Sequence, residues 1–358
     1  MARFHPLKIR DVRPETKECN SYAFEIPDDL REHFRYLPGQ HLTLQARIDG
    51  ELFRRNYSLC SCPSEGEWRI AIKRIPGGRF SNWANDNLGV GDVIEVMPPI
   101  GNFVVRTDPA LARHHLAFVA GSGITPVMSI LKAVLKEEPQ SLFTLFYVNR
   151  STDTIIFREE LEALKNRYLQ RFSLHHILTR EHPGSDLLHG RPDAAKVRAL
   201  ARTLFTPDDV DEFYLCGPGE MIEEVRSTLM DLGVATGRIH FERFTSPEQD
   251  QHTGGRSWQP PTDGDVHAHI TITLDGKTFS FDQPTSGRPI LDAALAAGAD
   301  LPFACKGGVC CTCKARIISG KAAMEVNWGL EEEEVQKGYI LTCQAHPLTS
   351  ELVLTFDE

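Results

Sequence analysis

The sequence predicts a multidomain protein with three folded units: an antiparallel β-barrel over residues 1–107, a doubly wound α/β domain over 108–245, and a small α+β domain over 265–358. Three observations support this prediction. Short β-rich segments fill the first part of the chain, strands and helices alternate in the second, and four of the nine cysteines crowd together in the third.

The composition is that of a globular protein and excludes disordered and collagen-like classes. Of 358 residues, 41% are hydrophobic and 25% are charged, and the formal net charge is −10. This acidic balance disfavours nucleic acid as a partner, because phosphate contacts need clustered basic residues. The best apolar run, 116–120, is far shorter than the ~20 residues of a membrane span, and residues 1–10 lack a signal-peptide core. We therefore expect a cytoplasmic protein with no membrane partner.

Antiparallel strands are expected in the first domain because its apolar residues alternate or cluster in short β-rich runs. These runs lie at residues 42–48, 68–73 and 93–96, with glycine or proline between them. Many short strands at close spacing are typical of an antiparallel barrel or sandwich.

A different rhythm begins near residue 110, where strands and helices alternate. Residues 116–120 are predicted to form a buried strand, which a glycine-rich turn and a helix follow. Further strands are predicted at 142–148, 173–179 and 212–216, and helices at 128–136, 157–168 and 219–232. This alternation predicts a parallel, doubly wound sheet, which binds ligands at the carboxyl ends of its strands.

A polar segment with several prolines and glycines, 246–264, is predicted to be a linker. After it, residues 269–274 and 278–281 are predicted to pair as a hairpin around Asp275-Gly276, and 289–297 to form a helix. This last part of the chain is also the most acidic per residue. Its charge fits either a solvated surface or a docking face for a basic partner.

The cysteine cluster is the most specific signal in the sequence. Its spacing is C-x4-C-x2-C, and a fourth cysteine follows after 29 intervening residues. This is the spacing of plant-type [2Fe–2S] sites, in which four thiolates hold two irons. The predicted ligands are Cys305, Cys310, Cys313 and Cys343.

Gly307 and Gly308 supply the small residues that such a loop needs if its backbone N–H groups are to approach the sulfides. Cys311 does not fit the spacing, and we expect it to pack or to point away from the irons. The alternative is a zinc site with four cysteine ligands. It is disfavoured because structural zinc sites usually show two separate C-x2-C pairs, whereas this chain has one.

A glycine-rich turn between a predicted strand and a predicted helix indicates a dinucleotide site. Gly121 and Gly123 would let the backbone approach a pyrophosphate at the helix N-terminus, and Thr125 follows them. The full fingerprint has a third glycine where this chain has Pro126, so a purely structural turn is the alternative. Cys216-Gly217-Pro218 closes a later strand, at the edge where such sheets bind ligands.

Basic residues after two of the strands favour NADPH over NADH. Arg150 follows a strand at a position where an NAD site often has a carboxylate for the ribose, and an arginine there suits a 2′-phosphate. Thr179 and Arg180 follow the next strand and add a second cationic donor. Asp153 lies close enough in the sequence that NADH stays an alternative.

Two segments of the β-rich domain are candidates for a flavin site. Arg55 could clamp a phosphate, Tyr57 could pack on a flavin face, and Ser58 could bond the ring edge, although an ordinary surface strand is the default explanation. A second glycine loop, 75–82, offers free backbone donors. Its candidate residues are Gly77, Gly78 and Ser81.

These segments occur in the order R-x-Y-S, G-G-x-x-S, G-x-G-x-T-P and C-G-P. With this order, the first ~245 residues resemble the ferredoxin–NADP reductase superfamily. Because a plant-type ferredoxin pattern follows, the whole chain resembles oxygenase reductases, and in particular the reductase subunits of phenylacetyl-CoA (ring 1,2-) epoxidases. The stretches that carry this resemblance are residues 38–44, 186–191, 304–310 and 343–350.

The resemblance implies a flavin-binding β-barrel, a nucleotide-binding domain and a β-grasp ferredoxin domain. It implies that Ser58 lies near the flavin N5 and Cys216 near the nicotinamide, where they would help to align hydride transfer. Phe244 is the expected substitute for an aromatic terminus that shields the flavin. FAD would also contact Arg55, Tyr57, Gly77, Gly78 and Ser81, and NADPH would contact Gly121, Gly123, Thr125, Arg150, Thr179, Arg180, Gly217 and Pro218.

The implied function is a reductase that passes electrons from NADPH through FAD and a [2Fe–2S] cluster to an oxygenase in phenylacetate degradation, the oxygenase being a separate chain. A flavin must stand between donor and cluster, because the nucleotide gives two electrons together and the cluster accepts one. Two alternatives stay open. The chain could serve another oxygenase, hydroxylase or desaturase, or it could be a non-catalytic redox sensor, which the intact flavin and nucleotide loops disfavour.

Overall fold

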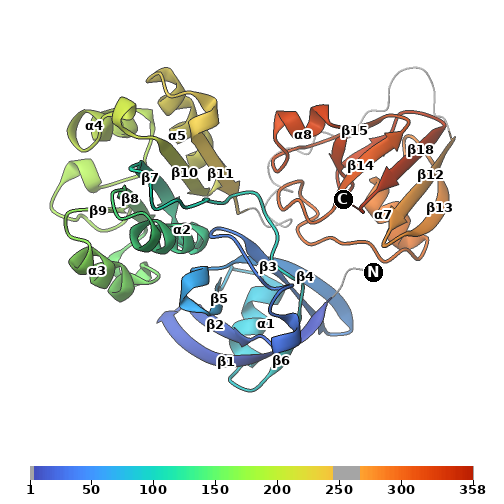
Figure 1. The fold of residues 1–358 in the computed structure, drawn as a ribbon, viewed down its shortest axis with the longest axis horizontal. Helices are drawn as coiled ribbons and strands as arrows, with labels where there is room; N and C mark the ends of the chain where they lie inside the picture. The colour runs from blue at the N-terminus through green and yellow to red at the C-terminus, as the bar shows by residue number, and fades with distance from the viewer. Residues whose placement is uncertain (1–3, 245–266, 358) are drawn as a thin grey trace. The chain divides into compact units, whose positions relative to one another are not determined.

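The computed structural model describes residues 4–244 and 267–357 (Figure 1). The chain divides into two compact units. The larger contains His5–Phe53 and Tyr57–Phe244, and the C-terminal part of the chain belongs to the smaller. The predicted linker at 246–264 lies outside the described residues.

Six strands form an antiparallel sheet in the order β4-β3-β6-β1-β2-β5. The runs predicted at 42–48, 68–73 and 93–96 correspond to β3, β5 and β6, and the antiparallel β-barrel domain is confirmed. Its core holds large side chains such as Tyr22, Phe34 and Phe80. The bounds are β1 His5–Thr16, β2 Cys19–Glu25, β3 His41–Ile48, β4 Glu51–Ser58, β5 Trp68–Lys73 and β6 Val93–Val96, with helix α1 Arg79–Asn87 and 3-10 turns Asp28–Leu30 and Pro63–Glu65.

A second sheet of five parallel strands has the order β11-β10-β7-β8-β9, which confirms the predicted doubly wound domain. The bounds are β7 His114–Ala120, β8 Leu142–Asn149, β9 Phe172–Leu178, β10 Glu212–Gly217 and β11 Ile239–Arg243, with helices α2 Ile124–Glu137, α3 Arg158–Arg167, α4 Ala194–Thr203 and α5 Gly219–Asp231, and 3-10 turns Gly121–Gly123, Thr152–Thr154, Asp186–Leu188, Pro207–Asp209 and Thr236–Arg238.

Alternation along the parallel strands gives this sheet an apolar core on each face. Ala117 and Val119 of β7 face the core that α2 and α3 cover, whereas Leu116 and Phe118 face the core that α4 and α5 cover. The sequence pattern did not predict α4 or β11. Helix α4 buries only Val197 and Leu200, which is too few for a clear helical period.

The C-terminal unit contains a mixed sheet in the order β13-β12-β18-β14-β16, in which β12 and β18 are parallel. The predicted hairpin forms around Asp275 and Gly276, both at positive φ, and the predicted α+β domain is confirmed. The bounds are β12 His267–Leu274, β13 Lys277–Pro284, α7 Ile290–Ala296, β14 Lys314–Ser319, β15 Ala322–Met324, α8 Glu332–Gln336, β16 Tyr339–Leu341, β17 Ala345–Pro347 and β18 Glu351–Thr355, of which β15 and β17 pair separately.

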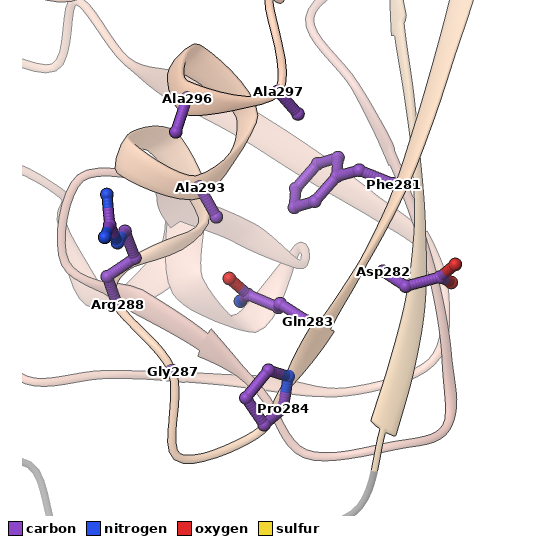
Figure 2. A pocket seen from close by; sticks show the side chains of 9 residues that line it. All are labelled: Phe281, Asp282, Gln283, Pro284, Gly287, Arg288, Ala293, Ala296 and Ala297. Atoms are coloured by element: carbon purple, nitrogen blue, oxygen red, sulfur yellow. The ribbon is translucent and has the colours of Figure 1, made fainter.

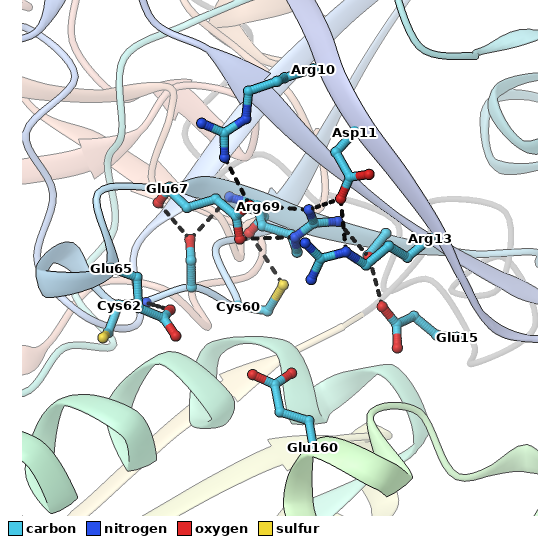
Figure 3. Close-up of polar contacts among 12 residues, drawn as sticks. Arg10, Asp11, Arg13, Glu15, Cys60, Cys62, Glu65, Glu67, Arg69 and Glu160 are labelled. Carbon is cyan, nitrogen blue, oxygen red and sulfur yellow. Dashed lines mark hydrogen bonds and ion pairs between the residues drawn. The ribbon is translucent and has the colours of Figure 1, made fainter.

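A buried arginine joins three strands of the β-barrel (Figure 3). Arg69 on β5 is 4% exposed, and its guanidinium donates to Ser21 on β2 at 2.9 Å and to Glu67 at 3.0 Å, and also pairs with Asp11 on β1. Burial by itself would raise the pKa of Glu67, but the bonds from Arg69 outweigh it and the pKa falls. Burying this cation is tolerated because each of its neighbours supplies an acceptor.

Among the described residues, no helix combines the length and the hydropathy that a membrane span requires.

A buried histidine begins β3, at the end of the barrel that faces the parallel sheet. His41 is 3% exposed, and its backbone pairs with Ile100 through bonds of 2.9 and 3.1 Å. Its Nδ1 lies 3.9 Å from the Glu242 carboxylate on β11, which is too long for a hydrogen bond. Burial therefore dominates and lowers the pKa of His41 to about 4.

This histidine predicts a loss of stability in acid. Below the unfolded-state pKa of about 6.5, the unfolded chain binds a proton that the folded chain does not, so the free energy of unfolding falls with pH by about 1.4 kcal/mol per unit down to about pH 4. We expect His41→Gln to reduce the slope by up to this amount in denaturant titrations of the full chain. Other histidines whose pKa burial lowers keep their own contributions; these are His114, His115, His175 and His176. His33→Gln, which removes an exposed histidine, is expected to keep the wild-type slope because His41 is still present. Identical slopes in the wild type and His41→Gln would contradict the prediction.

Candidate functional site

The glycine turn after β7 lies directly against the end of β10. A Cβ added to Gly123 would lie 2.4 Å from the carbonyl oxygen of Cys216, so no larger residue fits without moving the backbone. Gly121 has φ of +53°, and its carbonyl oxygen accepts a bond of 3.0 Å from the Tyr147 hydroxyl of β8. The turn thus brings three strands together at the carboxyl edge of the sheet, as the sequence predicted.

The end of β10 completes this edge. Gly217 has φ of +154°, and a Cβ there would meet Met221 and Ala120 at 3.0 and 3.1 Å. Pro218 immediately precedes α5. Cys216 is fully buried, and burial raises the pKa of its thiol well above the usual range, so the thiol stays protonated at neutral pH.

Thr125 has a structural contact that its sequence position did not reveal. Its hydroxyl donates to the Ser122 carbonyl oxygen at 3.0 Å, and the residue is 2% exposed. The side chain therefore fastens the glycine turn to the first turn of α2.

Two arginines lie side by side where β8 and β9 end. The Thr179 amide donates to the Asn149 carbonyl at 2.9 Å, and the Arg180 amide donates to the Arg150 carbonyl at 2.8 Å. Both arginines are exposed, and Thr179, which precedes Arg180, is partly exposed. The structure therefore gathers all three residues that the sequence predicted for a 2′-phosphate.

The acidic residues beside these arginines have local partners. Glu181 accepts bonds of 2.7 Å from both the amide and the hydroxyl of Thr152. Asp153 accepts a bond of 2.5 Å from the Ser151 hydroxyl. These carboxylates accept from neutral donors and keep their negative charge, and the exposed side chains of Arg150 and Arg180 supply the positive charge of this corner.

Both predicted catalytic residues meet through a residue that the sequence analysis missed. Ser58 ends β4 and is 3% exposed, and its hydroxyl donates to the Glu242 carboxylate at 3.2 Å. Glu242 lies on β11 as the parallel register partner of Cys216 on β10. The barrel and the parallel sheet, both in the larger unit, therefore share one site built from Ser58, Glu242 and Cys216.

Phe244 follows β11 at the same edge. Its amide donates to the Gly217 carbonyl at 3.4 Å, and its ring packs on the apolar core that contains Cys216. The segment around Glu242 was noted in the sequence only for this aromatic residue. Glu242 could have been identified from the sequence as a carboxylate at the carboxyl end of an additional parallel strand.

The remaining candidates of the barrel lie on β4 and before α1. The partly exposed Tyr57 ring packs against Phe80 with a centroid distance of 5.8 Å, and the Arg55 guanidinium donates to the Arg54 carbonyl at 2.9 Å. Gly77 has φ of +75°, and Gly78 precedes α1, whose N-terminus has no side-chain cap. Uncapped amides at a helix N-terminus suit a phosphate group.

Ser81 braces this glycine loop from within. Its hydroxyl accepts from the Ile75 amide at 3.2 Å and donates to the Gly78 carbonyl at 3.5 Å, and the residue is 5% exposed. Its side chain therefore shapes the loop that presents the backbone donors.

In the C-terminal unit the four predicted ligand thiols form two pairs. Cys310 donates a hydrogen bond to Cys305, and Cys343 donates one to Cys313. The Gly307 amide also donates to the Cys305 sulfur at 3.3 Å, and these bonds lower the pKa of Cys305 to about 7. Within the described ranges, no three His, Cys, Asp or Glu side chains converge on a position for one metal ion.

This pairing fits a cluster with two irons, each of which takes two cysteine ligands. The loop reaches it through left-handed backbone at Lys306, Gly308 and Cys311, with φ of +52°, +72° and +55°. The Cys311 thiol turns to the Gly329 carbonyl oxygen at 3.0 Å, as expected for the cysteine outside the spacing.

Three family models match the chain in the order of its domains. The oxidoreductase FAD-binding domain matches residues 6–105, the oxidoreductase NAD-binding domain matches 118–227, and the 2Fe-2S iron-sulfur cluster binding domain matches 272–348.

Two relatives match over nearly their full length. The chain is 43% identical over 357 residues to a subunit of the 1,2-phenylacetyl-CoA epoxidase of Escherichia coli K12, covering 100% of this chain and 99% of the relative. It is 36% identical to the ferredoxin reductase component of 3-ketosteroid-9-alpha-monooxygenase from Rhodococcus rhodochrous, covering 98% and 96%. The solved structure of phthalate dioxygenase reductase matches with a TM-score of 0.58 and 25% identity, covering 99% and 98%.

In this chain the FAD-binding model, the NAD-binding model and the 2Fe-2S model match in that order. The Escherichia coli and Rhodococcus proteins both exceed 30% identity along nearly their whole length. The chain therefore belongs to the family of oxygenase reductase components that carry FAD-binding, NAD-binding and 2Fe-2S domains in one polypeptide.

Proposed function

We propose that this protein passes electrons from NADPH through FAD and a [2Fe–2S] cluster to the oxygenase component of a phenylacetyl-CoA 1,2-epoxidase, in phenylacetate degradation. The observation that carries the proposal is the 43% identity with one of the subunits of that enzyme over the full chain. The meeting of Ser58, Glu242 and Cys216, together with the paired thiols, supports it from the structure.

FAD, when bound, takes two electrons as a hydride and releases them singly, and the cluster carries them one at a time. The chain's part is to hold and orient. We assign the flavin phosphates to Arg55 and to the loop of Gly77, Gly78 and Ser81, and the flavin ring to Tyr57 and Ser58. The uncapped start of α1 and the aromatic stack behind Tyr57 support this assignment.

Ser58, Glu242 and Cys216 would orient the flavin edge and the nicotinamide. The Ser58 hydroxyl is held by the Glu242 carboxylate, whose side chain is 16% exposed and could exchange protons with solvent. Cys216 keeps its proton because it is buried, so its neutral side chain would act as a spacer and not as a nucleophile. Holding the two rings in alignment would accelerate hydride transfer.

We assign NADPH to the carboxyl edge of the parallel sheet. The turn with Gly121, Gly123 and Thr125 and the corner with Gly217 and Pro218 would hold the pyrophosphate and nicotinamide. The 2′-phosphate would lie between the arginines after β8 and β9, beside Thr179. The backbone bond between the two arginines and the exposure of both side chains support this choice over NADH.

The limits of the functional parts follow from these assignments. We propose an FAD-binding domain at 1–107, a nucleotide domain at 108–245, a linker at 246–264 and a ferredoxin domain at 265–358. Cys305, Cys310, Cys313 and Cys343 would ligate the cluster. The protein would work in the cytoplasm with an oxygenase as its partner and without nucleic acid or membrane.

A second candidate function is that of a reductase for another oxygenase, hydroxylase or desaturase, which the 36% identity to the 3-ketosteroid monooxygenase component favours. Reconstitution separates the two. With NADPH, the protein should support turnover by a purified phenylacetyl-CoA epoxidase oxygenase component. Failure with this component, alongside intact NADPH-dependent reduction of cytochrome c, would defeat the first proposal and leave the second. A redox sensor would fail in both assays.

The nucleotide corner predicts a specific loss of NADPH affinity. Arg150→Ala and Arg180→Ala should each raise the KM for NADPH about tenfold, because one charge-assisted hydrogen bond contributes roughly 1.5 kcal/mol. The KM for NADH should not change. Arg202→Ala on α4 controls for loss of an exposed arginine. Equal increases for both nucleotides would show that the 2′-phosphate lies elsewhere.

The thiol pairs predict which cysteine can be replaced without loss of electron transfer through the cluster. Cys343→Ser should abolish NADPH-dependent reduction of cytochrome c, while NADPH still bleaches the flavin spectrum in a stopped-flow trace. Cys311→Ser is the matched control, since a hydroxyl keeps the bond to Gly329 and the cluster ligands are untouched. Loss of flavin bleaching in Cys343→Ser, or loss of the cluster in Cys311→Ser, would contradict the ligand assignment.

A further inference from the structure

The C-terminal unit contains a cavity that none of the assigned sites uses. It lies between the end of β13 and helix α7 and has a volume of about 440 Å³, within the range of small-molecule sites (Figure 2). Its lining shares no residue with the thiol loop. Strand β13 contributes Phe281, Asp282, Gln283 and Pro284, and the following turn contributes Gly287 and Arg288. Helix α7 and the residue after it contribute only alanines.

Gln283 is a polar side chain buried without a partner. It is 6% exposed, and neither its Nε2 nor its Oε1 makes a hydrogen bond in the described structure. Its amide points into the cavity in Figure 2. Exchange of the two amide atoms would not relieve this, because one end must donate and the other must accept in either orientation. A buried unpaired amide is costly, so its presence needs an explanation.

The neighbouring residue shows that the normal alternation of side chains along β13 directs Gln283 to the cavity side. Successive side chains of a strand point to opposite faces. Asp282 accordingly points away from Gln283 and pairs with His269 of β12 at 2.7 Å. Its carboxylate is therefore directed to the other face of the strand, away from the Gln283 amide.

A cation stands at the rim of the cavity. Arg288 is exposed, and it has no hydrogen-bond or ion-pair partner among the described residues. Figure 2 shows its side chain extending along the cavity toward Ala293. A guanidinium in this position can bind a carboxylate through two parallel hydrogen bonds.

The opposite walls are apolar and flat. The Phe281 ring and Pro284 lie on one side, and Ala293, Ala296 and Ala297 on the other. The short alanine side chains leave room for a ring between helix and strand, where its faces would contact carbon atoms only.

We propose that this cavity binds a small aromatic carboxylate that carries an O–H or N–H donor next to the carboxylate. The carboxylate would accept from Arg288 and from the Gln283 Nε2, the adjacent donor would bond the Gln283 Oε1, and the ring would fill the apolar slot. Such a ligand satisfies every unpaired group that the cavity presents. This site is independent of the flavin, nucleotide and cluster assignments, and electron transfer does not depend on it.

Calorimetric titration of the full-length holoprotein tests the proposal with mandelate as the probe. Mandelate has a phenyl ring, a carboxylate and an adjacent hydroxyl. We expect saturable binding in the millimolar range, which is usual for a ligand of this size. Phenylacetate, which lacks the hydroxyl, should bind several-fold more weakly, and 2-phenylethanol, which lacks the charge, about tenfold more weakly. No saturable heat from mandelate would mean that the cavity holds only water and would overturn the proposal.

Variants locate the binding. Arg288→Ala should weaken mandelate about tenfold, and Gln283→Leu should abolish the preference for mandelate over phenylacetate. Lys277→Ala removes an exposed cation from the same strand, outside the cavity, and should bind as the wild type does. All three variants should reduce cytochrome c with NADPH at the wild-type rate. Unchanged mandelate binding in Arg288→Ala and Gln283→Leu would overturn the proposal.

A stability measurement separates a binding role from a structural one. If Gln283 is kept for a ligand, Gln283→Leu should unfold at a higher temperature than the wild type without ligand, because an unpaired buried amide is replaced by a hydrocarbon of similar size. A lower unfolding temperature would show that the amide supports the fold, which would contradict the proposal.

Discussion

The candidate site of the larger unit depends on one hydrogen bond between two sheets of different kinds. Ser58 ends a strand of the antiparallel barrel, and Glu242 lies on the last strand of the parallel sheet, 184 residues away along the chain. Because Glu242 is also in register with Cys216, this bond places the barrel's candidate flavin residues against the strand ends of the nucleotide domain. Neither domain could form this site alone, since each contributes one wall of it.

A close approach between two backbone segments shapes the same carboxyl edge of the parallel sheet. Gly123 lies so near the Cys216 carbonyl that no side chain fits between them, and the turn after β7 is thereby held against β10. The hydroxyls of Tyr147 and Thr125 then fasten the turn from two sides. The glycines of this turn therefore serve two purposes. They let the backbone approach a phosphate, and they let it approach the neighbouring strand.

Two buried polar side chains, Arg69 and Gln283, follow opposite rules. Arg69 is buried with an acceptor for each side of its guanidinium, and the cation is stabilised where it lies. Gln283 is buried with no partner for either end of its amide, and the fold is destabilised where it lies. Because buried polar groups are nearly always paired, the second case marks a place where structure alone does not account for the residue.

The sequence by itself determined what depends on neighbours along the chain. The four cysteine ligands, the turn at Asp275 and Gly276, and the strand rhythm of the two larger domains are local patterns, and geometry within one loop or one strand decides them. Helix α4 escaped prediction because only two of its residues are deeply buried. Glu242 and the Gln283 cavity escaped because each owes its meaning to elements that meet only in the folded chain. Only the tertiary structure decided the roles of these residues, because the groups that lie opposite a carboxylate or an amide come from distant parts of the chain and cannot be identified from its sequence neighbours.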